Sequence, residues 1–444
     1  MRTRTGPATD GEPRLRADAA TNAEPPPRAP DRRREPRRQR AFLTPFDGLL
    51  RDIRAAHGAD LYCLYPRIEQ ALEAGQVSVG GRSAISLIAN DYLGLGSDPR
   101  VHDAARDAIT ELGSSRCASP LVGGYTTVHR TLEEQLASFL DQESAAVFAS
   151  GYQANLGVIS ALMDQGDLIV SDLLNHASIV DGARLSGAEL RFFQHNDPSH
   201  LERILDSVGT GRRTLVIVEG IYSADGDVAP LPEICDVAHA QHALVMVDEA
   251  HSLGVLGDEG RGAAASYDLL GEVDLVAGTM SKSLGSVGGF VAGGAALTDV
   301  IRHNARSLIF SAALPPANAA AALTALTIMR SECSRRRRLW ENTSTLLGGL
   351  QARGLDTMGS TTPVVPVLVG EPNTTLALTS SLMDSGVLVC PGVPPMVQSH
   401  RSRIRMHVTA AHDAAGIARA LDAIEAATAT LGMLDDHAGE AAPG

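Results

Sequence analysis

The sequence predicts an α/β fold: a large domain with a mainly parallel central sheet flanked by helices, followed by a smaller C-terminal α+β domain. From about residue 85 onward, short apolar runs alternate with helical patterns, a spacing typical of βαβ units. These runs are continuously apolar, as expected for strands that helices cover on both faces. After Ser311 the chain changes to Ala-rich helical patterns separated by single strands, which indicates the second domain.

The individual elements follow in order along the chain. The strand candidates of the large domain are 145–148, 167–170, 190–193, 215–218, 244–247 and 273–276, and helical stretches include 132–140, 155–163 and 231–240. The smaller domain is expected to contain a long helix over 316–353, a strand over 364–369, a helix over 376–385, a strand over 403–408 and a final helix over 414–431.

The first 40 residues differ from the rest, with 11 arginines against six acidic residues and three consecutive prolines. Such a composition is typical of a disordered arm, and it lacks the apolar centre of a secretory signal. We expect a solvated tail, with a docking element as the alternative. The predicted organisation is a disordered arm 1–40, an N-terminal segment 41–90, a large domain 91–310, a small domain 311–435 and a tail 436–444.

Composition restricts the partners and the location. The net charge is -14, and -19 without the arm, which argues against nucleic acid and favours a small-molecule substrate. The five cysteines are far apart with no Cys-x-x-Cys pair, so we expect neither a metal site nor disulfides, but reduced thiols in the cytoplasm. No run of about 18 apolar residues occurs, so no transmembrane helix is expected.

Lys282 is the only lysine in the chain, and the other 37 basic residues are arginine. Arginine cannot lose its proton and form an imine, because the guanidinium stays charged. A lysine amine can do so once burial or neighbouring charge lowers its pKa. A single lysine could also arise by chance, so the interpretation depends on its surroundings.

These surroundings predict a pyridoxal 5'-phosphate (PLP) enzyme in which Lys282 holds the cofactor as a Schiff base. Lys282 lies among small and hydroxyl residues in 277–285, which suits close approach to a flat, phosphorylated cofactor. Asp248 directly follows a strand candidate, and the carboxyl ends of parallel strands are where such folds bind ligands. A carboxylate there would keep a pyridine nitrogen protonated, and His251 is placed to bond the ring hydroxyl.

The segment Asp248-Glu249-Ala250-His251 alone also resembles a helicase-type nucleotide motif, and His251 alone could be a buried core histidine. A Gly-x-x-x-x-Gly-Lys-Ser/Thr loop is absent from the sequence. An ATPase would therefore lack its phosphate-binding loop.

From about Ile88 to Leu431 the chain resembles the α-oxoamine synthases, fold-type-I PLP enzymes that include 8-amino-7-oxononanoate synthase, glycine C-acetyltransferase and serine palmitoyltransferase. The matching blocks are NDYLGL at 90–95, GYTTVH at 124–129, SGYQAN at 150–155, NHAS at 175–178, EGIYSADGD at 219–227, the segments around Asp248 and Lys282, FSAALPP at 310–316 and RIR at 403–405.

The resemblance implies a set of cofactor contacts. Gly151 and Tyr152 would offer backbone amides to the phosphate at a helix start, where an anion is favoured. Thr279 would also reach the phosphate. His176 would stack on the pyridine face, and Ser223 would touch the region of the ring hydroxyl.

The resemblance also implies a substrate site and a homodimer. Arg405 would clamp the amino-acid carboxylate by a bidentate pair, and Asn90 would contact the substrate or acyl donor. Ser311 would reach the phosphate of the neighbouring subunit, so that the active site lies at the dimer interface. The residues predicted to be catalytic are Lys282, His176 and Asp248.

The reaction implied is the condensation of a small L-amino acid (glycine, alanine or serine) with an acyl thioester, followed by loss of carbon dioxide, to give an α-amino ketone. The freed amine of Lys282 would remove the α-proton, and the resulting carbanion would attack the thioester. The sequence leaves open which amino acid is used, and whether the thioester is acyl-CoA or acyl carrier protein.

Two segments depart from the family pattern. Val393 and Met396 replace an arginine and a threonine that many members carry, and 114–120 (SSRCASP) replaces a glycine-rich stretch. The substrate is therefore not the common biotin-pathway thioester, or other residues have taken over these contacts. The alternatives are another fold-type-I reaction (aminotransferase or aldol-type lyase) and a non-catalytic partner subunit, which the presence of Lys282 argues against.

Overall fold

The computed structural model describes residues 37–48, 50–51, 63–209, 211–394 and 396–433, and the chain divides into two compact units. The described part of the first unit, within 1–62, contains helix α1 (Arg37–Leu43) and the 3-10 turn η2 (Thr44–Phe46). The second unit, 63–444, contains all other elements described below. Most of the predicted arm and the whole predicted tail lie outside the described residues.

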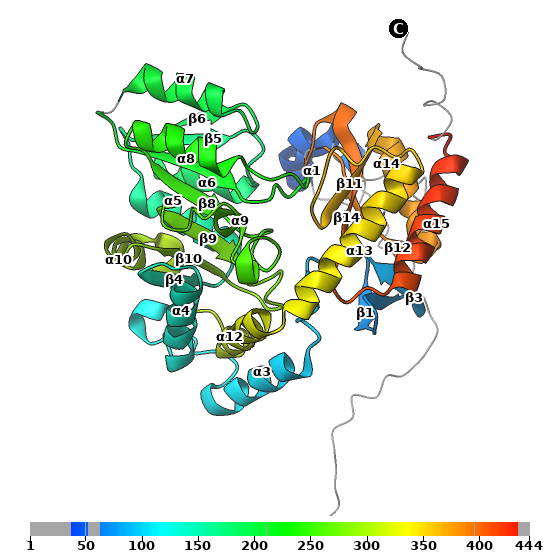
Figure 1. The fold of residues 1–444 in the computed structure, drawn as a ribbon, viewed down its shortest axis with the longest axis horizontal. Helices are drawn as coiled ribbons and strands as arrows, with labels where there is room; N and C mark the ends of the chain where they lie inside the picture. Colours follow the sequence, from blue (N-terminus) through cyan, green and yellow to red (C-terminus); the bar gives the residue numbers. More distant parts are fainter. Residues whose placement is uncertain (1–36, 49, 52–62, 210, 395, 434–444) are drawn as a thin grey trace, which may run out of the picture. The chain divides into compact units, whose positions relative to one another are not determined.

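A seven-stranded sheet forms the centre of the larger part of the second unit (Figure 1). Its order is β4-β10-β9-β8-β7-β5-β6, and the run from β9 to β6 is parallel. The prediction of a mainly parallel sheet is confirmed; β10, which the sequence pattern did not reveal, runs antiparallel to β4 and β9. The strands are β4 (Ser144–Phe148), β5 (Leu168–Asp172), β6 (Glu189–Phe193), β7 (Thr214–Glu219), β8 (Leu244–Asp248), β9 (Leu275–Thr279) and β10 (Gly289–Gly293).

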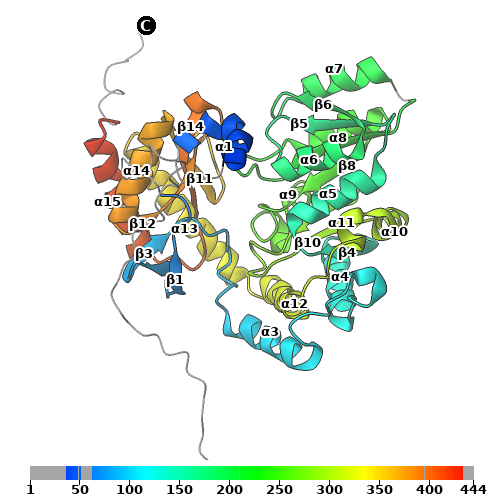
Figure 2. The ribbon, with the colours of Figure 1, turned by 180° about the vertical axis from the view of Figure 1, so that it is seen from behind.

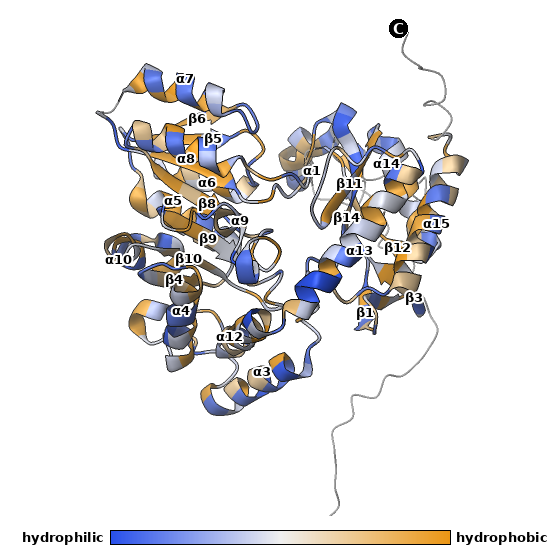
Figure 3. Ribbon diagram, in the orientation of Figure 1, coloured by the Kyte–Doolittle hydropathy of each residue, from blue (hydrophilic) through white to orange (hydrophobic). Residues whose placement is uncertain are grey.

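Helices cover both faces of this sheet, which explains the continuously apolar strand sequences. Val245 and Val247 of β8 join the core on one face, with side chains of α4, α7, α8 and α12, whereas Met246 joins the core on the other face, with α5, α6 and α10. Figure 3 shows the apolar strands between helices with hydrophilic outer residues. The helices are α3 (Pro99–Leu112), α4 (Thr127–Phe139), α5 (Gly151–Leu162), α6 (Ala177–Ser186), α7 (Pro198–Val208), α8 (Leu231–Ala240), α9 (Ala263–Ser266), α10 (Ala295–Asn304) and α11 (Arg306–Ile309), with 3-10 turns η3 (Pro120–Val122) and η4 (Asp258–Gly260).

The single helix predicted over 316–353 is wrong, because the segment forms two helices, α12 (Pro316–Ser331) and α13 (Cys333–Ala352). Glu332 between them leaves the helical conformation, with φ -114° and ψ 74°. Its carboxylate accepts bonds from Arg100 Nη1 at 2.6 Å and Arg335 Nε at 2.9 Å. The break allows α12 to pack against α3 and the large-sheet core, while α13 packs against α15.

The remaining part of the second unit contains two smaller sheets (Figure 2). One has the antiparallel order β11-β14-β13, and the other joins the hairpin strands β1, β2 and β3 to β12, which pairs with β3 in parallel. Their elements are β1 (Ile68–Ala71), β2 (Gln76–Val79), β3 (Arg82–Ser86), β11 (Val364–Gly370), α14 (Pro372–Asp384), β12 (Val387–Leu388), β13 (Cys390–Gly392), η5 (Ser399–Arg401), β14 (Ser402–His407) and α15 (Ala414–Thr430). The smaller α+β part is thus present, and the boundaries at 90/91 and 310/311 stay predictions. None of the described helices is long and apolar enough to cross a membrane.

Candidate active site

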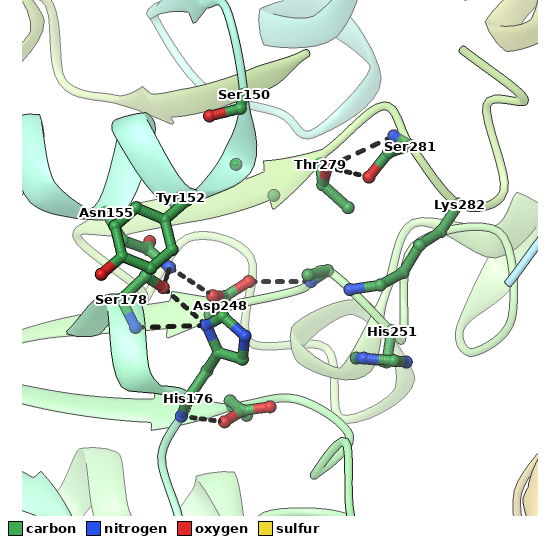
Figure 4. Close-up of a pocket in the computed structure, with 14 residues that line it drawn as sticks. Ser150, Tyr152, Asn155, His176, Ser178, Asp248, His251, Thr279, Ser281 and Lys282 are labelled. Carbon is green, nitrogen blue, oxygen red and sulfur yellow. Dashed lines mark hydrogen bonds between the residues drawn. The ribbon is translucent and has the colours of Figure 1, made fainter. Parts of the chain in front are cut away.

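A cavity of about 280 Å³ lies where β8 and β9 end and α5 and α6 begin (Figure 4). Carboxyl ends of parallel strands and amino ends of helices meet at this edge, so ligand-binding groups converge there. The structure brings seven predicted residues together in the cavity wall: Gly151, Tyr152, His176, Asp248, His251, Thr279 and Lys282.

One end of the cavity is built to hold an anion. Ser150 caps α5, with its Oγ accepting from the backbone N–H of Gln153 at 3.2 Å, and the free N–H groups at a helix start attract negative charge. The hydroxyls of Thr279 and Ser281 lie 2.8 Å apart beside this helix start. A Cβ on Gly151 would approach Thr279 Cβ to 3.0 Å, so a glycine is needed for this close contact. The start of α5 and the two neighbouring hydroxyls together fit the phosphate of PLP.

Asp248, at the last position of β8, is fixed by two hydrogen bonds. Its Oδ2 accepts from Asn155 Nδ2 at 2.7 Å, and its Oδ1 accepts from the backbone N–H of Ala250 at 2.9 Å. The same Asn155 amide donates to Ser178 Oγ at 2.9 Å. The carboxylate is buried and faces the cavity, which is the position that a protonated pyridine nitrogen requires.

His176 caps the first turn of α6 and presents its ring to the cavity (Figure 4). Its Nδ1 lies 2.8 Å from Ser178 Oγ, and its backbone N–H donates to Glu219. Burial lowers the pKa of His176, so the ring is neutral at pH 7. A neutral, flat ring held in this way suits contact with the face of an aromatic cofactor.

Lys282 points into the cavity toward Asp248 (Figure 4). Burial lowers the pKa of its amine to about 8, against the opposing charges of Asp248 and Glu219 and with the help of Arg405. The turn that follows the lysine is closed by Gly285, whose N–H donates to Lys282 O at 2.8 Å. Gly285 has φ +54°, and a Cβ there would lie 2.3 Å from the backbone nitrogen of Gly96. The glycine at position 285 therefore allows a tight turn after Lys282. Because of its lowered pKa, the lysine amine is partly neutral.

His251 is oriented by Tyr92, which the sequence analysis did not select. The Tyr92 hydroxyl lies 2.7 Å from His251 Nδ1, and both side chains are buried. Burial raises the pKa of Tyr92 and lowers that of His251 well below its usual range, so the phenol keeps its proton and the imidazole is neutral. If Nδ1 carried the hydrogen, the buried phenol would have no acceptor in the described structure, which is unfavourable. Tyr92 therefore donates, and His251 keeps its proton on Nε2.

Replacing Tyr92 with phenylalanine is expected to weaken PLP binding about three- to tenfold, because one buried hydrogen bond and the tautomer it selects are lost. Cofactor titration of the apoprotein measures the affinity, and nitrogen-15 NMR of the histidines reports the tautomer. Tyr267→Phe, which removes a hydroxyl outside the cavity wall, is the control. Unchanged affinity and an unchanged His251 tautomer would contradict this assignment.

The predicted substrate residues Asn90 and Arg405 do not belong to the cavity wall, although the charge of Arg405 acts on Lys282 and His176 in that wall. Arg405 Nη1 donates to the backbone oxygen of Ser223 at 2.7 Å. The Nε of Arg405 and the Oδ1 of Asn90 are buried without a hydrogen-bond partner among the described residues. Buried orphan polar atoms call for a ligand or water, so both groups are available to a polar substrate. In this contact Ser223 contributes its backbone oxygen and not its hydroxyl.

Ser311 also lies outside the cavity wall. Its Oγ accepts from Gln153 Nε2 at 3.4 Å, next to the start of α5. The hydroxyl is therefore close to the anion-binding end of the cavity, and its predicted role toward a neighbouring subunit remains a proposal.

Five residues that shape the site were missed as functional: Ser150, Asn155, Ser178, Glu219 and Tyr92. All five lie inside the matching blocks, but only their spatial contacts reveal what they do. Glu219 is an example, because its burial and the nearby Asp248 charge raise its pKa to about 8.

The sequence pattern of the aminotransferase class I and II family matches residues 82–424. An 8-amino-7-oxononanoate synthase from Thermoanaerobacter pseudethanolicus is 42% identical over 348 residues, which cover 78% of this chain and 88% of that protein. Another from Trichlorobacter lovleyi is 41% identical over 398 residues, covering 89% and 98%. Among solved structures, serine palmitoyltransferase from S. paucimobilis with PLP and myriocin bound superposes with a TM-score of 0.86 at 34% identity, covering 88% of this chain and 99% of that one.

Proposed function

Because the chain belongs to the aminotransferase class I and II family and, within it, to the α-oxoamine synthases, we propose that it joins a small L-amino acid to an acyl thioester with loss of carbon dioxide. It is a PLP-dependent acyltransferase. The observation that carries the proposal is the meeting of the only lysine, Lys282, with Asp248, His176 and His251 around one cavity that has an anion-binding end.

Each side chain is assigned a task. When bound, PLP supplies an electron sink for the charge that develops at the amino-acid α-carbon. Lys282 would hold the cofactor, and its neutral amine is the base available for the α-proton. Asp248 would keep a proton on the ring nitrogen, and the ring of His176 would lie against the cofactor and exclude water. His251, with its proton on Nε2, would donate to the ring hydroxyl region.

Arg405 is assigned to the amino-acid carboxylate, and Asn90 to the substrate or acyl donor. The bond from Arg405 Nη1 to Ser223 O fixes the guanidinium plane. The unpartnered Nε remains for the ligand, and charge-assisted bonds of this kind are both strong and directional. Glycine, L-alanine and L-serine all carry the groups that these two residues recognise.

The rate at which PLP attaches to the apoprotein is expected to rise with pH through about 8, because only the neutral amine of Lys282 is a nucleophile. Burial disfavours its charged form, so the amine loses its proton well below the ordinary lysine value of 10.5. Stopped-flow absorbance of PLP mixed with apoprotein over a pH series measures the midpoint. A midpoint close to that of a free lysine amine would contradict the burial argument.

The acyl group is of one of two chemical types among the relatives. The name 8-amino-7-oxononanoate describes a product whose chain ends in a carboxylate, whereas a palmitoyl chain ends in a methyl group.

The test of the proposed reaction is an absorbance titration of the PLP-loaded protein with glycine, L-alanine and L-serine, followed by addition of acyl thioesters. We expect one amino acid to change the cofactor spectrum and thioester addition to release free thiol and carbon dioxide. Formation of a keto acid or an aldehyde without thiol release would overturn the proposal in favour of another fold-type-I reaction.

We further propose a homodimer and a cytoplasmic location. Leu121, Val122 and Phe310 are exposed apolar side chains. The first two belong to η3, which packs against α11, and Phe310 directly precedes Ser311. Exposed apolar patches often mark protein interfaces. All five cysteines are free, which is compatible with a reducing compartment.

A further inference from the structure

A second cavity, of about 190 Å³, lies between α14, the β12–β13 segment and residues 63–66. Its wall is mainly apolar and includes Leu64, Ile88, Met383, Leu388 and Val389. Two thiols, Thr379 and the exposed Tyr65 also line it, and the hydroxyl of Thr379 already donates to the backbone oxygen of Thr375 at 2.8 Å. Among the described residues, the wall contains no charged side chain.

This cavity adjoins the residues assigned to the substrate. Cys390, in its wall, pairs with Arg405 across the β13–β14 ladder, and its Sγ lies 3.8 Å from Arg405 Nη2. Ile88, on the same wall, lies two residues before Asn90. The second cavity therefore begins directly behind the groups proposed to hold the amino acid.

We propose that this cavity receives the hydrocarbon chain of the acyl thioester, and that it selects a chain ending in a methyl group over one ending in a carboxylate. The inference rests on the proposed function and specifies its acyl donor. An apolar chain gains by leaving water for an apolar wall. A carboxylate that enters the same space finds no positively charged side chain in the described wall and is strongly disfavoured.

Arg405, which approaches the wall at Cys390, is already committed. One of its nitrogens is bonded to Ser223 O, and its free donor is assigned to the amino-acid carboxylate. The selectivity thus differs from that of the curated relatives with higher identity, whose product name includes a terminal carboxylate. It follows from the wall of this cavity and not from overall similarity.

The test compares thioesters of pantetheine, the arm that coenzyme A and carrier proteins share. Heptanoyl-pantetheine and its counterpart with a terminal carboxylate differ only at the chain end. We expect kcat/KM to favour heptanoyl by on the order of 100-fold or more, because the carboxylate would be buried unpaired. Within the unbranched series, kcat/KM should rise about fourfold per methylene until the cavity is full.

Three variants connect this selectivity with the cavity. Thr379→Phe fills the space and should move the optimum to shorter chains, whereas Met383→Arg adds a cation and should reduce the discrimination against the carboxylate at least tenfold. Asn373→Phe, an exposed position on the same helix outside the wall, is the matched control and should leave the profile unchanged. Calorimetric affinities for heptanoyl-pantetheine and its carboxylate-ended counterpart provide a readout independent of turnover.

The outcomes separate the two proposals. Equal or better use of the carboxylate-ended thioester overturns the proposed selectivity. If Thr379→Phe leaves the chain-length profile unchanged, the assignment of the acyl chain to this cavity is wrong. That result is expected if another part of the chain fills the cavity. If no thioester reacts although amino acids bind, the proposed function fails, and the calorimetric preference and its loss in Thr379→Phe still decide whether the cavity binds acyl chains.

Discussion

Replacing Lys282 with arginine is expected to give a folded protein that no longer holds PLP covalently and turns over at least about 10⁴-fold more slowly. Arginine preserves the positive charge and much of the length, but it cannot form an imine or accept the α-proton. Both tasks assigned to Lys282 are therefore lost together. Lys282→Ala should lose the same functions and the charge as well.

The measurement uses the fact that the chain has no second lysine. Borohydride reduction of the PLP-loaded protein should add one phosphopyridoxyl group to the peptide that contains Lys282, and mass spectrometry should find none on the arginine variant. Circular dichroism and thermal unfolding of the apoprotein control for folding. A variant that keeps the covalent cofactor or substantial turnover would refute the central assignment.

The cofactor-binding edge could be predicted because its signals are local in sequence. Asp248 follows a continuously apolar strand, and Lys282 follows another, so their common edge results from parallel pairing of β8 and β9. Any sequence that forms these strands places the two residues near each other. Gly151, at the start of α5, was predicted only through the resemblance of the block at 150–155 to the family.

The supporting contacts could not be predicted, because they join residues far apart in the chain. Asn155 reaches Asp248 across 93 positions, and Tyr92 reaches His251 across 159. The break at Glu332 is similar, since a glutamate is compatible with a helix and its partner Arg100 is 232 residues away. These contacts depend on the packing of whole helices, which no short window of sequence encodes.

The strand β10 was missed for a different reason. Its sequence Gly-Phe-Val-Ala-Gly is glycine-rich, and glycine is usually unfavourable within strands. In the structure a Cβ on Gly289 would lie 2.4 Å from Ser150 O, so the glycine is required by the adjacent start of α5. Gly289 thus makes β10 hard to recognise in the sequence, but it is needed because the start of α5, at the anion-binding end of the site, lies against it.

Asp248→Asn is expected to lower turnover by about 10³-fold while leaving the shape of the cavity nearly intact. The amide has the size of the carboxylate but no charge, so it cannot hold a proton on the ring nitrogen, and the cofactor becomes a weaker electron sink. The carboxylate accepts from both Asn155 and Ala250, and an amide can accept with its oxygen only. One of these donors therefore loses its partner, and we expect PLP to bind less tightly as well.

The same substitution makes a second, independent prediction about pH. The charge of Asp248 raises the pKa of Lys282 against the effect of burial, which leaves it at about 8. Removing that charge lets the pKa of the amine fall further, so the pH midpoint for PLP attachment should move below about 8 in Asp248→Asn. Asp181→Asn changes a carboxylate that bonds the Tyr152 hydroxyl but does not line the cavity, and it should shift neither turnover nor the midpoint appreciably. If Asp248→Asn kept turnover within a few fold of the unaltered enzyme, Asp248 could not be the partner of the ring nitrogen. If the pH midpoint moved upward, the charge of Asp248 could not be what raises the pKa of Lys282.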